Sequence, residues 1–330
     1  MIYPIAFSIP REVIVPYVPF KMQHTATHKY QFDDSKLYLE NYRSSIFGET
    51  TLKCGWDCLR HYEILSQGTI PNFKKRPGPY CPNGLADCPQ YTMFNYPKKQ
   101  TLSLIEKYGS LEFSEIMRTS SSELYEELDD LLQYTRANLT NEASADYVLS
   151  TLGVPGSRKI LYLANVKKNE SDDNYLYNML VNGFKNNTKG ECDMYPELDH
   201  HYKSFSLQET KKMHGKGFNY TRNLDDSYRN KVNKEEIVDR LKIGYYDKIV
   251  IFMVHRNELN SNDFIDVNSP NYIFKYYSPT NIAFICGHDC DSFFVDGEYR
   301  IKMQHECHLR SKVLKDISIF IRECGPNINI

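Results

Sequence analysis

The sequence predicts an α/β protein that consists of two units, each with an open, largely parallel sheet. Short apolar runs that suit buried strands alternate along the chain with segments whose apolar residues recur at helical spacing. The chain has 330 residues, 41% of them hydrophobic, which is enough to bury two cores. We therefore expect two Rossmann-like domains, residues 1–155 and 156–330, with a ligand-binding cleft between them.

The first half begins with a proline-rich stretch and continues as part of a βαβ unit. Residues 1–40 predict loops and edge strands, because prolines interrupt the apolar runs. Next, the pattern predicts a loop, a helix over residues 57–67 that Asp57 caps and Gly68 ends, and a strand over residues 69–73.

Helices complete the first half. Residues 110–139 carry apolar residues at helical spacing and an acidic outer face. A further helix is expected before Gly153, which would stop it, and its candidate N-caps are Thr140 and Asn141. These helices form the C-terminal part of the first domain.

The second half alternates strands and helices more regularly. Residues 159–166, 245–255 and 281–289 are apolar runs typical of buried parallel strands. Residues 172–186 and 233–244 have the apolar spacing of amphipathic helices. This alternation favours a parallel sheet with helical crossovers.

Charge and composition exclude several classes of protein. Forty basic residues oppose forty-two acidic ones, and the net charge of −2 provides no general attraction to nucleic acid or to an anionic membrane. No run approaches the roughly 20 apolar residues of a membrane span, and prolines break the N-terminal segment where a signal peptide would lie. Nine scattered cysteines favour reduced thiols. We expect a cytoplasmic protein. The abundance of tyrosine and asparagine suggests an AT-rich genome such as that of a large virus, whose proteins would act in the host cytoplasm.

The loop and helix around "CGWDCLRHYE" form a candidate anion site. Helix N-termini at the carboxyl edge of a parallel sheet point free amides toward ligands. The residues that suit a phosphate are Thr50, Thr51, Lys53, Gly55 and Arg60. Glu63, one turn into the helix, suits the paired hydroxyls of a ribose. The structural alternative is that Asp57 only caps, Arg60 pairs with an acid, Glu63 is solvated and Trp56 belongs to the core.

Polar residues at strand ends in the second half are candidate catalytic groups. They are His255, His288, Asp289 and Asp291. A base must reach the acceptor hydroxyl, and strand-end residues have the expected position. We expect the strand ends at His255 and Gly287 to face the start of the 57–67 helix. The alternative for each candidate is turn chemistry or a satisfied polar pair.

Two other clusters carry weaker signals. Cys54, Cys58, Cys81 and Cys88 do not form the Cys-x2-Cys pairs of a zinc site, so buried or incidental thiols are favoured. The pair His200 and His201 lies in a segment that reads as a polar loop without a chemical role.

A resemblance to a known family lies in residues 44–73, "SSIFGETTLKCGWDCLRHYEILSQGTIPNF", and in the "CPQYTMFNYPK" that follows. These residues resemble the donor-site region of GT-B glycosyltransferases of the exostosin-like, giant-virus or algal type. The resemblance implies that Glu63 binds the ribose of a nucleotide-sugar and that Arg60 and Lys53 bind its diphosphate, with His61 as a weaker correspondence. Position 55 is Gly where retaining families have a second glutamate, which leaves the stereochemical outcome open.

The second half resembles the partner domain of the same enzymes through "KILYLANV", "MHGKGFNYTRNL", "YYDKIVIFMVHR" and "IAFICGHDCDSF". In a standard GT-B chain this acceptor-side domain comes first. The C-terminal "SIFIRECG" resembles the strand that normally leads into "YPIAFSIP", which stands here at the N-terminus. The resemblance therefore implies a circularly permuted domain order or a chain cut from a longer array.

The implied function is that of a glycosyltransferase, a hexosyl- or pentosyltransferase in glycan biosynthesis. It would move a sugar from a nucleotide-diphospho-sugar to a hydroxyl of a glycan, lipid or protein acceptor, without a metal or other cofactor. The alternative is a degenerate GT-B module that binds a nucleotide or sugar without catalysis. An unrelated phosphate-handling enzyme is disfavoured, because neither a Gly-x4-Gly-Lys-Ser/Thr loop nor a Gly-x-Gly-x-x-Gly fingerprint is present.

Overall fold

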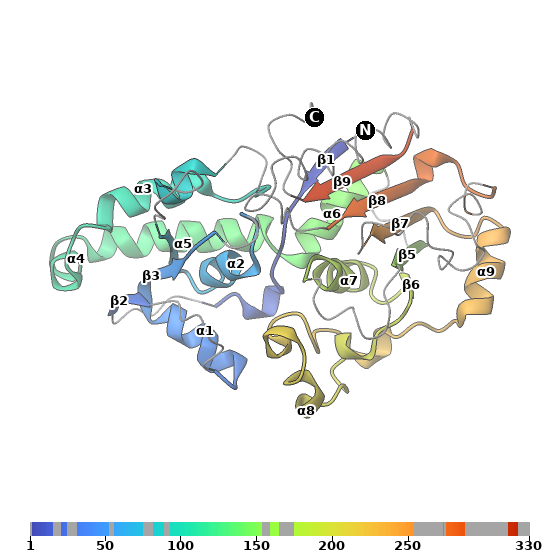
Figure 1. Cartoon of the computed structure of the whole chain (residues 1–330), viewed down its shortest axis with the longest axis horizontal. Coiled ribbons are helices and arrows are strands. Elements are labelled where there is room, and N and C mark those ends of the chain that lie inside the picture. Colours follow the sequence, from blue (N-terminus) through green and yellow to red (C-terminus); the bar gives the residue numbers. More distant parts are fainter. Residues whose placement is uncertain are drawn as a thin grey trace.

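Two parallel sheets of six and three strands organise the chain, in a computed structural model (Figure 1). The structure describes residues 2–15, 21–24, 32–52, 56–74, 82–88, 93–153, 159–164, 175–253, 273, 275–287 and 316–322. Helices cover both sheets, which confirms the predicted α/β class.

The larger sheet has the strand order β1-β9-β8-β7-β5-β6, and every pair is parallel. Its strands are β1 (Ile2–Ile5), β5 (Ile160–Ala164), β6 (Asp193–Tyr195), β7 (Lys248–Met253), β8 (Ile282–Cys286) and β9 (Ser318–Arg322). The three apolar runs predicted as buried strands are β5, β7 and β8. Strands β5 to β9 follow the flavodoxin-like order of doubly wound sheets, in which the switch point lies between β5 and β7.

The first strand of the chain belongs to this larger sheet. β1 pairs with β9, so that Ile2 lies opposite Ile319 and Ile5 lies opposite Arg322. The expected edge position of the N-terminal segment is confirmed. A division at residue 155 counts β1 with the first half, whereas its hydrogen bonds join it to the strands of the second half.

The smaller sheet contains β2 (Lys21–His24), β3 (Ser45–Thr50) and β4 (Ile70–Phe73), parallel and in chain order. The helices α1 (Ser35–Arg43) and α2 (Leu59–Leu65) connect them as two successive βαβ units. The pattern over residues 42–73 predicts a loop before the helix, and that prediction is wrong for residues 45–50, because β3 is a buried strand there. Gly48 allows α2 to approach β3, since a Cβ there would lie 2.7 Å from Ile64 Cγ2.

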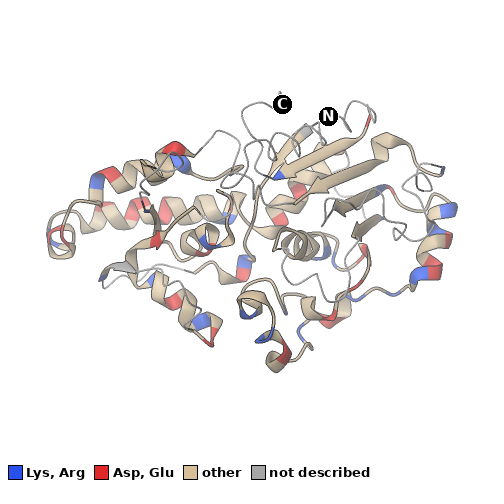
Figure 2. Cartoon of the chain, viewed as in Figure 1, with Lys and Arg blue, Asp and Glu red and all other residues tan. Residues whose placement is uncertain are grey.

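The remaining helices are α3 (Lys98–Tyr108), α4 (Phe113–Thr119), α5 (Ser121–Asn138), α6 (Asn141–Thr151), α7 (Tyr175–Asn187), α8 (Leu207–Thr210) and α9 (Lys234–Lys242). Two predicted helix ends are confirmed. Thr140 Oγ1 accepts a hydrogen bond from the Ala143 amide at 3.2 Å, and Gly153 adopts φ +74° beyond α6. Basic and acidic residues are interspersed along the outer helices (Figure 2).

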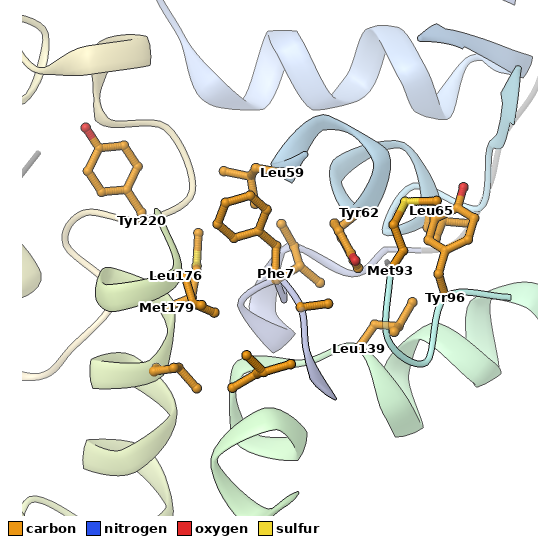
Figure 3. Packing of buried hydrophobic residues seen from close by; sticks show 14 of the residues in the cluster. Phe7, Leu59, Tyr62, Leu65, Met93, Tyr96, Leu139, Leu176, Met179 and Tyr220 are labelled. Carbon is orange, nitrogen blue, oxygen red and sulfur yellow. The ribbon is translucent and has the colours of Figure 1, made fainter. Parts of the chain in front are cut away.

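One continuous apolar cluster joins the two sheets. Phe7 lies between Leu59 of α2 and the α7 residues Leu176 and Met179 (Figure 3). On the larger sheet the cluster takes alternate strand residues such as Tyr162. A second cluster, which includes residues of α9, covers the opposite face of that sheet. The larger sheet is thus buried on both faces, as a doubly wound sheet requires.

Within the described ranges, no helix has both the length and the apolar character needed to cross a membrane.

Candidate functional site

The carboxyl edge of the larger sheet meets the start of α2. Arg322, the last residue of β9, donates from Nη1 to the Asp57 carbonyl at 2.8 Å and from Nε to the Gly287 carbonyl at 3.2 Å. Gly287 directly follows β8. One guanidinium therefore joins the strand end at Gly287 to the segment that enters α2, whereas the other predicted strand end, at His255, lies outside the described residues.

Asp57 supports this junction from the other side. Its Oδ2 accepts from the Phe7 amide at 2.8 Å, and its Oδ1 accepts from the Tyr62 hydroxyl at 2.6 Å. Arg322 Nη1 lies 3.6 Å from Asp57 Oδ2, and both residues are buried. Burial and the Asp57 charge raise the pKa of Tyr62 well above its usual value, so Tyr62 remains a hydrogen-bond donor.

The prediction that Asp57 caps the helix is wrong. α2 begins at Leu59, its N-cap residue is Cys58, and no side chain makes a capping hydrogen bond there. The physical reason is that the Asp57 carboxylate turns away from α2's amides toward Phe7 and Tyr62. Gly68 does end the helical region, with φ +65° and its amide donating to the Leu65 carbonyl at 3.0 Å.

Glu63 lies where the two halves meet. Its Oε2 accepts from the Tyr38 hydroxyl of α1 at 2.6 Å, and its Oε1 accepts from Asn219 Nδ2 of the second half at 2.6 Å. Glu63 is 6% exposed, so the alternative that it is solvated is wrong. Burial and the Glu63 charge raise the pKa of Tyr38, which keeps its hydroxyl protonated. The ribose-binding role stays a prediction.

Arg60 is partly exposed beside this carboxylate. Burial acts to lower the pKa of Arg60, but nearby Tyr42, Cys58, Tyr38 and Glu63 raise it, and the net shift is upward. The guanidinium therefore stays charged next to Glu63. The assignment of Arg60 to a diphosphate remains a prediction.

Thr50 and His61 make a buried contact between β3 and α2. Thr50 Oγ1 lies 3.0 Å from His61 Nδ1, and the imidazole lies 4.5 Å from the Phe73 ring. Thr50 is the last residue of β3 rather than a loop residue, so the contact fixes α2 against the end of β3. Thr51 Oγ1 donates to the Leu52 carbonyl at 3.2 Å.

Several predicted site residues lie outside the described residues. They are Lys53, Gly55, His255, His288, Asp289 and Asp291. Cys54 and Cys81 lie outside them too, whereas Cys58 is half-buried and Cys88 is buried. In the part of the chain that the structure describes, no three His, Cys, Asp or Glu side chains are grouped to hold a metal ion.

A buried polar cluster was not predicted. His200 Nε2 and His201 Nε2 lie 2.8 and 2.7 Å from Asn178 Oδ1 on α7. Both histidines are buried and lie in a short 3-10 helix, Asp199–His201, so the interpretation of this segment as a polar loop is wrong. No sequence signal indicated this cluster, because a polar stripe such as Asn178, Asn182 and Lys185 on a helix ordinarily marks its solvent face.

The chain matches no protein-family model, no curated protein and no solved structure. The arrangement of the site therefore has to carry the functional argument alone.

Proposed function

We propose that the protein is a glycosyltransferase that uses a nucleotide-diphospho-sugar, with the donor bound between its two α/β units. Parallel sheets bind ligands beyond the carboxyl ends of their strands. The observation that carries the proposal is the Arg322 contact, which brings the carboxyl ends of β8 and β9 against the loop that enters α2. A ligand at either sheet's carboxyl edge would lie near both halves.

The proposed roles follow from position and charge. Arg60, with Lys53, would neutralise the departing diphosphate, and Glu63 would accept hydrogen bonds from the ribose. The base for the acceptor hydroxyl would come from the residues after the strands of the larger sheet, with His255, His288, Asp289 and Asp291 as candidates. The acceptor would be a glycan, a lipid or a protein hydroxyl, and the reaction would proceed without a metal.

A specific observation favours a second candidate, a degenerate module that binds a nucleotide or sugar without transfer. Hydrogen bonds from Tyr38 and Asn219 already occupy both oxygens of Glu63. Hydrolysis of the donor separates the two candidates, because an active transferase leaks some donor to water and a binding module leaves it intact.

Substitution of Glu63 by Gln tests the donor site. The amide keeps the shape of the side chain and removes its charge, so nucleoside diphosphate should bind more weakly by about 1.5–3 kcal/mol. Titration calorimetry with uridine and guanosine diphosphate measures the change. Glu49→Gln is the matched control, because Glu49 is equally buried on β3 but pairs with Lys74. Unchanged affinity in a folded Glu63→Gln protein would remove Glu63 from the donor site.

A further inference from the structure

Residues 214–219, called here the latch segment, connect the second half to α1. Lys216 Nζ donates to the Phe32 carbonyl at 2.7 Å and pairs with Asp33 at 2.5 Å. The Phe218 ring lies 5.9 Å from the Tyr38 ring of α1. In Figure 1 the chain that follows α8 lies opposite α1. The latch segment thus reaches the smaller α/β unit at a place separate from the Arg322 junction.

The innermost contact of the latch segment is made to the proposed donor-binding carboxylate. Asn219 Nδ2 donates to Glu63 Oε1 at 2.6 Å, and Asn219 is 7% exposed. Tyr38, which also donates to Glu63, belongs to the same unit as α2 and lies 3.3 Å from the Tyr42 hydroxyl. Asn219 is therefore the donor that can leave Glu63 without disturbing the packing of α1 on α2.

The backbone of the latch segment is held in a conformation that most residues avoid. Gly215, Lys216, Gly217 and Asn219 have φ of +57°, +56°, +67° and +64°. Glycine and asparagine tolerate this left-handed region, whereas Lys216 meets a steric cost there. Hydrogen bonds within the second half, such as Tyr220 to the His214 carbonyl, and the contacts to the first half together keep the segment in place. Such segments often mark sites of conformational change.

A ribose hydroxyl and the Asn219 side-chain amide both need a carboxylate oxygen of Glu63 as a hydrogen-bond acceptor. Each donates a hydrogen bond to a carboxylate oxygen, and because Glu63 is 6% exposed, a ligand hydroxyl can reach that carboxylate only if a residue that now covers it moves away. We infer that the Asn219 amide is an internal competitor of the donor nucleotide at Glu63, and that nucleotide binding displaces the latch segment. This inference rests on the proposed function and adds to it a contact that holds the donor site closed.

Asn219→Gly is the direct test, because glycine keeps the left-handed backbone and removes the competing amide. Titration calorimetry with uridine and guanosine diphosphate should show about tenfold tighter binding than in the wild type, the gain expected when a hydrogen bond to a charged group no longer competes. Arg222→Gly is the matched control. Arg222 also has a positive φ, of +59°, but its guanidinium donates to the Phe205 carbonyl and not to Glu63.

Lys216→Asn is a second variant that leaves the Asn219 side chain unchanged. Asparagine tolerates the left-handed backbone and lacks the ammonium that contacts Phe32 and Asp33. Because Asp33, one partner of that ion pair, is 81% exposed, we expect a smaller gain in nucleotide affinity, about threefold. The variant provides the answer if Asn219→Gly does not fold.

The outcomes separate the inference from the proposed function. Tighter binding in the latch variants with unchanged binding in Arg222→Gly supports the inference. If the wild type binds nucleotide and the latch variants bind equally or more weakly, the inference is overturned while the proposed function stands. An equal gain in Arg222→Gly also overturns it, because general loosening of the chain would then explain the effect. If no nucleotide binds to the wild type or to any variant, the proposed function fails and the inference fails with it.

Discussion

Replacing Arg322 by Met should destabilise the folded protein strongly, because it leaves a buried charge without its partner. Both side chains of the pair are almost fully enclosed, at 1% exposure for Arg322 and 0% for Asp57. Arg322 also stacks over the Phe7 ring with its guanidinium carbon 4.5 Å from the ring centre. Methionine fills most of that space but donates no hydrogen bond to the two carbonyls.

The expected loss in free energy of unfolding is about 3 kcal/mol. Breaking a buried ion pair by removing one partner costs about 3–5 kcal/mol. The lower end of that range applies, because the Phe7 amide and the Tyr62 hydroxyl still donate to the Asp57 carboxylate. Removing the second charge as well, in Arg322→Met with Asp57→Asn, should recover about 2 kcal/mol relative to the sum of the single losses.

Urea unfolding followed by tryptophan fluorescence is the appropriate assay. The chain has a single tryptophan, Trp56, which is 1% exposed and adjacent to Asp57. Circular dichroism on the same samples shows whether the whole chain unfolds in the same transition. Arg43→Met is the control, because Arg43 pairs with Glu40 at the surface and should change stability by no more than about 0.5 kcal/mol.

Two results would refute this account of the junction. A loss below about 1 kcal/mol in Arg322→Met would mean that the Asp57 charge is compensated in another way. Simple additivity in the double variant would mean that the two charges do not interact, whatever their distance.

Two further predictions concern stability. Burial, followed by the charges of His200 and Lys185, lowers the pKa of His201 well below 6.5, so the unfolded chain binds a proton that the folded chain does not. As the pH falls below about 6.5, His201 should therefore lower the free energy of unfolding by about 1.4 kcal/mol per pH unit. Urea titrations at several pH values should show that the His201→Gln variant lacks this dependence. Gly183→Ala should cost about 2–3 kcal/mol in a melting experiment, because its Cβ would lie 2.1 Å from the Asn141 carbonyl oxygen, whereas Gly153→Ala meets nothing within 4 Å and should cost about 1 kcal/mol for its positive φ. Equal losses in the two glycine variants would contradict the packing argument.

Uninterrupted apolar runs and capped helices could be predicted from the sequence. β5, β7 and β8 are apolar enough to be read locally, and the N-cap of α6 is a threonine with an available hydroxyl. β3 could not be read in this way, because Ser45, Glu49 and Thr50 interrupt its apolar pattern although all three are buried. Glu49 is tolerated there because Lys74 pairs with it.

The candidate site was predictable only where its contacts are local in sequence. The order of polar loop, helix and Gly68 located α2 correctly to within two residues at each end. The contact between Arg322 and Asp57 spans 265 residues, and that between Asn219 and Glu63 spans 156. No spacing rule connects residues so far apart. The sequence therefore predicted that Asp57 caps a helix and that Glu63 binds a ligand, whereas the structure shows that both have partners from the other half of the chain.

The Arg322 junction and the latch segment are two of several contacts between the halves in the described part of the chain, and they differ in burial. The Arg322 junction is buried and holds two carbonyl groups and a carboxylate, so opening it would expose two charges that are costly to separate. The latch segment ends in the pair of Lys216 with the 81%-exposed Asp33, which solvent screens, and its backbone is under local strain. Because the shared apolar cluster and the hydrogen bonds between α6 and α7 also join the halves, we expect the latch segment to move by itself while the rest of the contact stays closed. Under the proposed function, a donor nucleotide would reach Glu63 from the side that Asn219 covers, and movement of the latch segment alone would suffice for access.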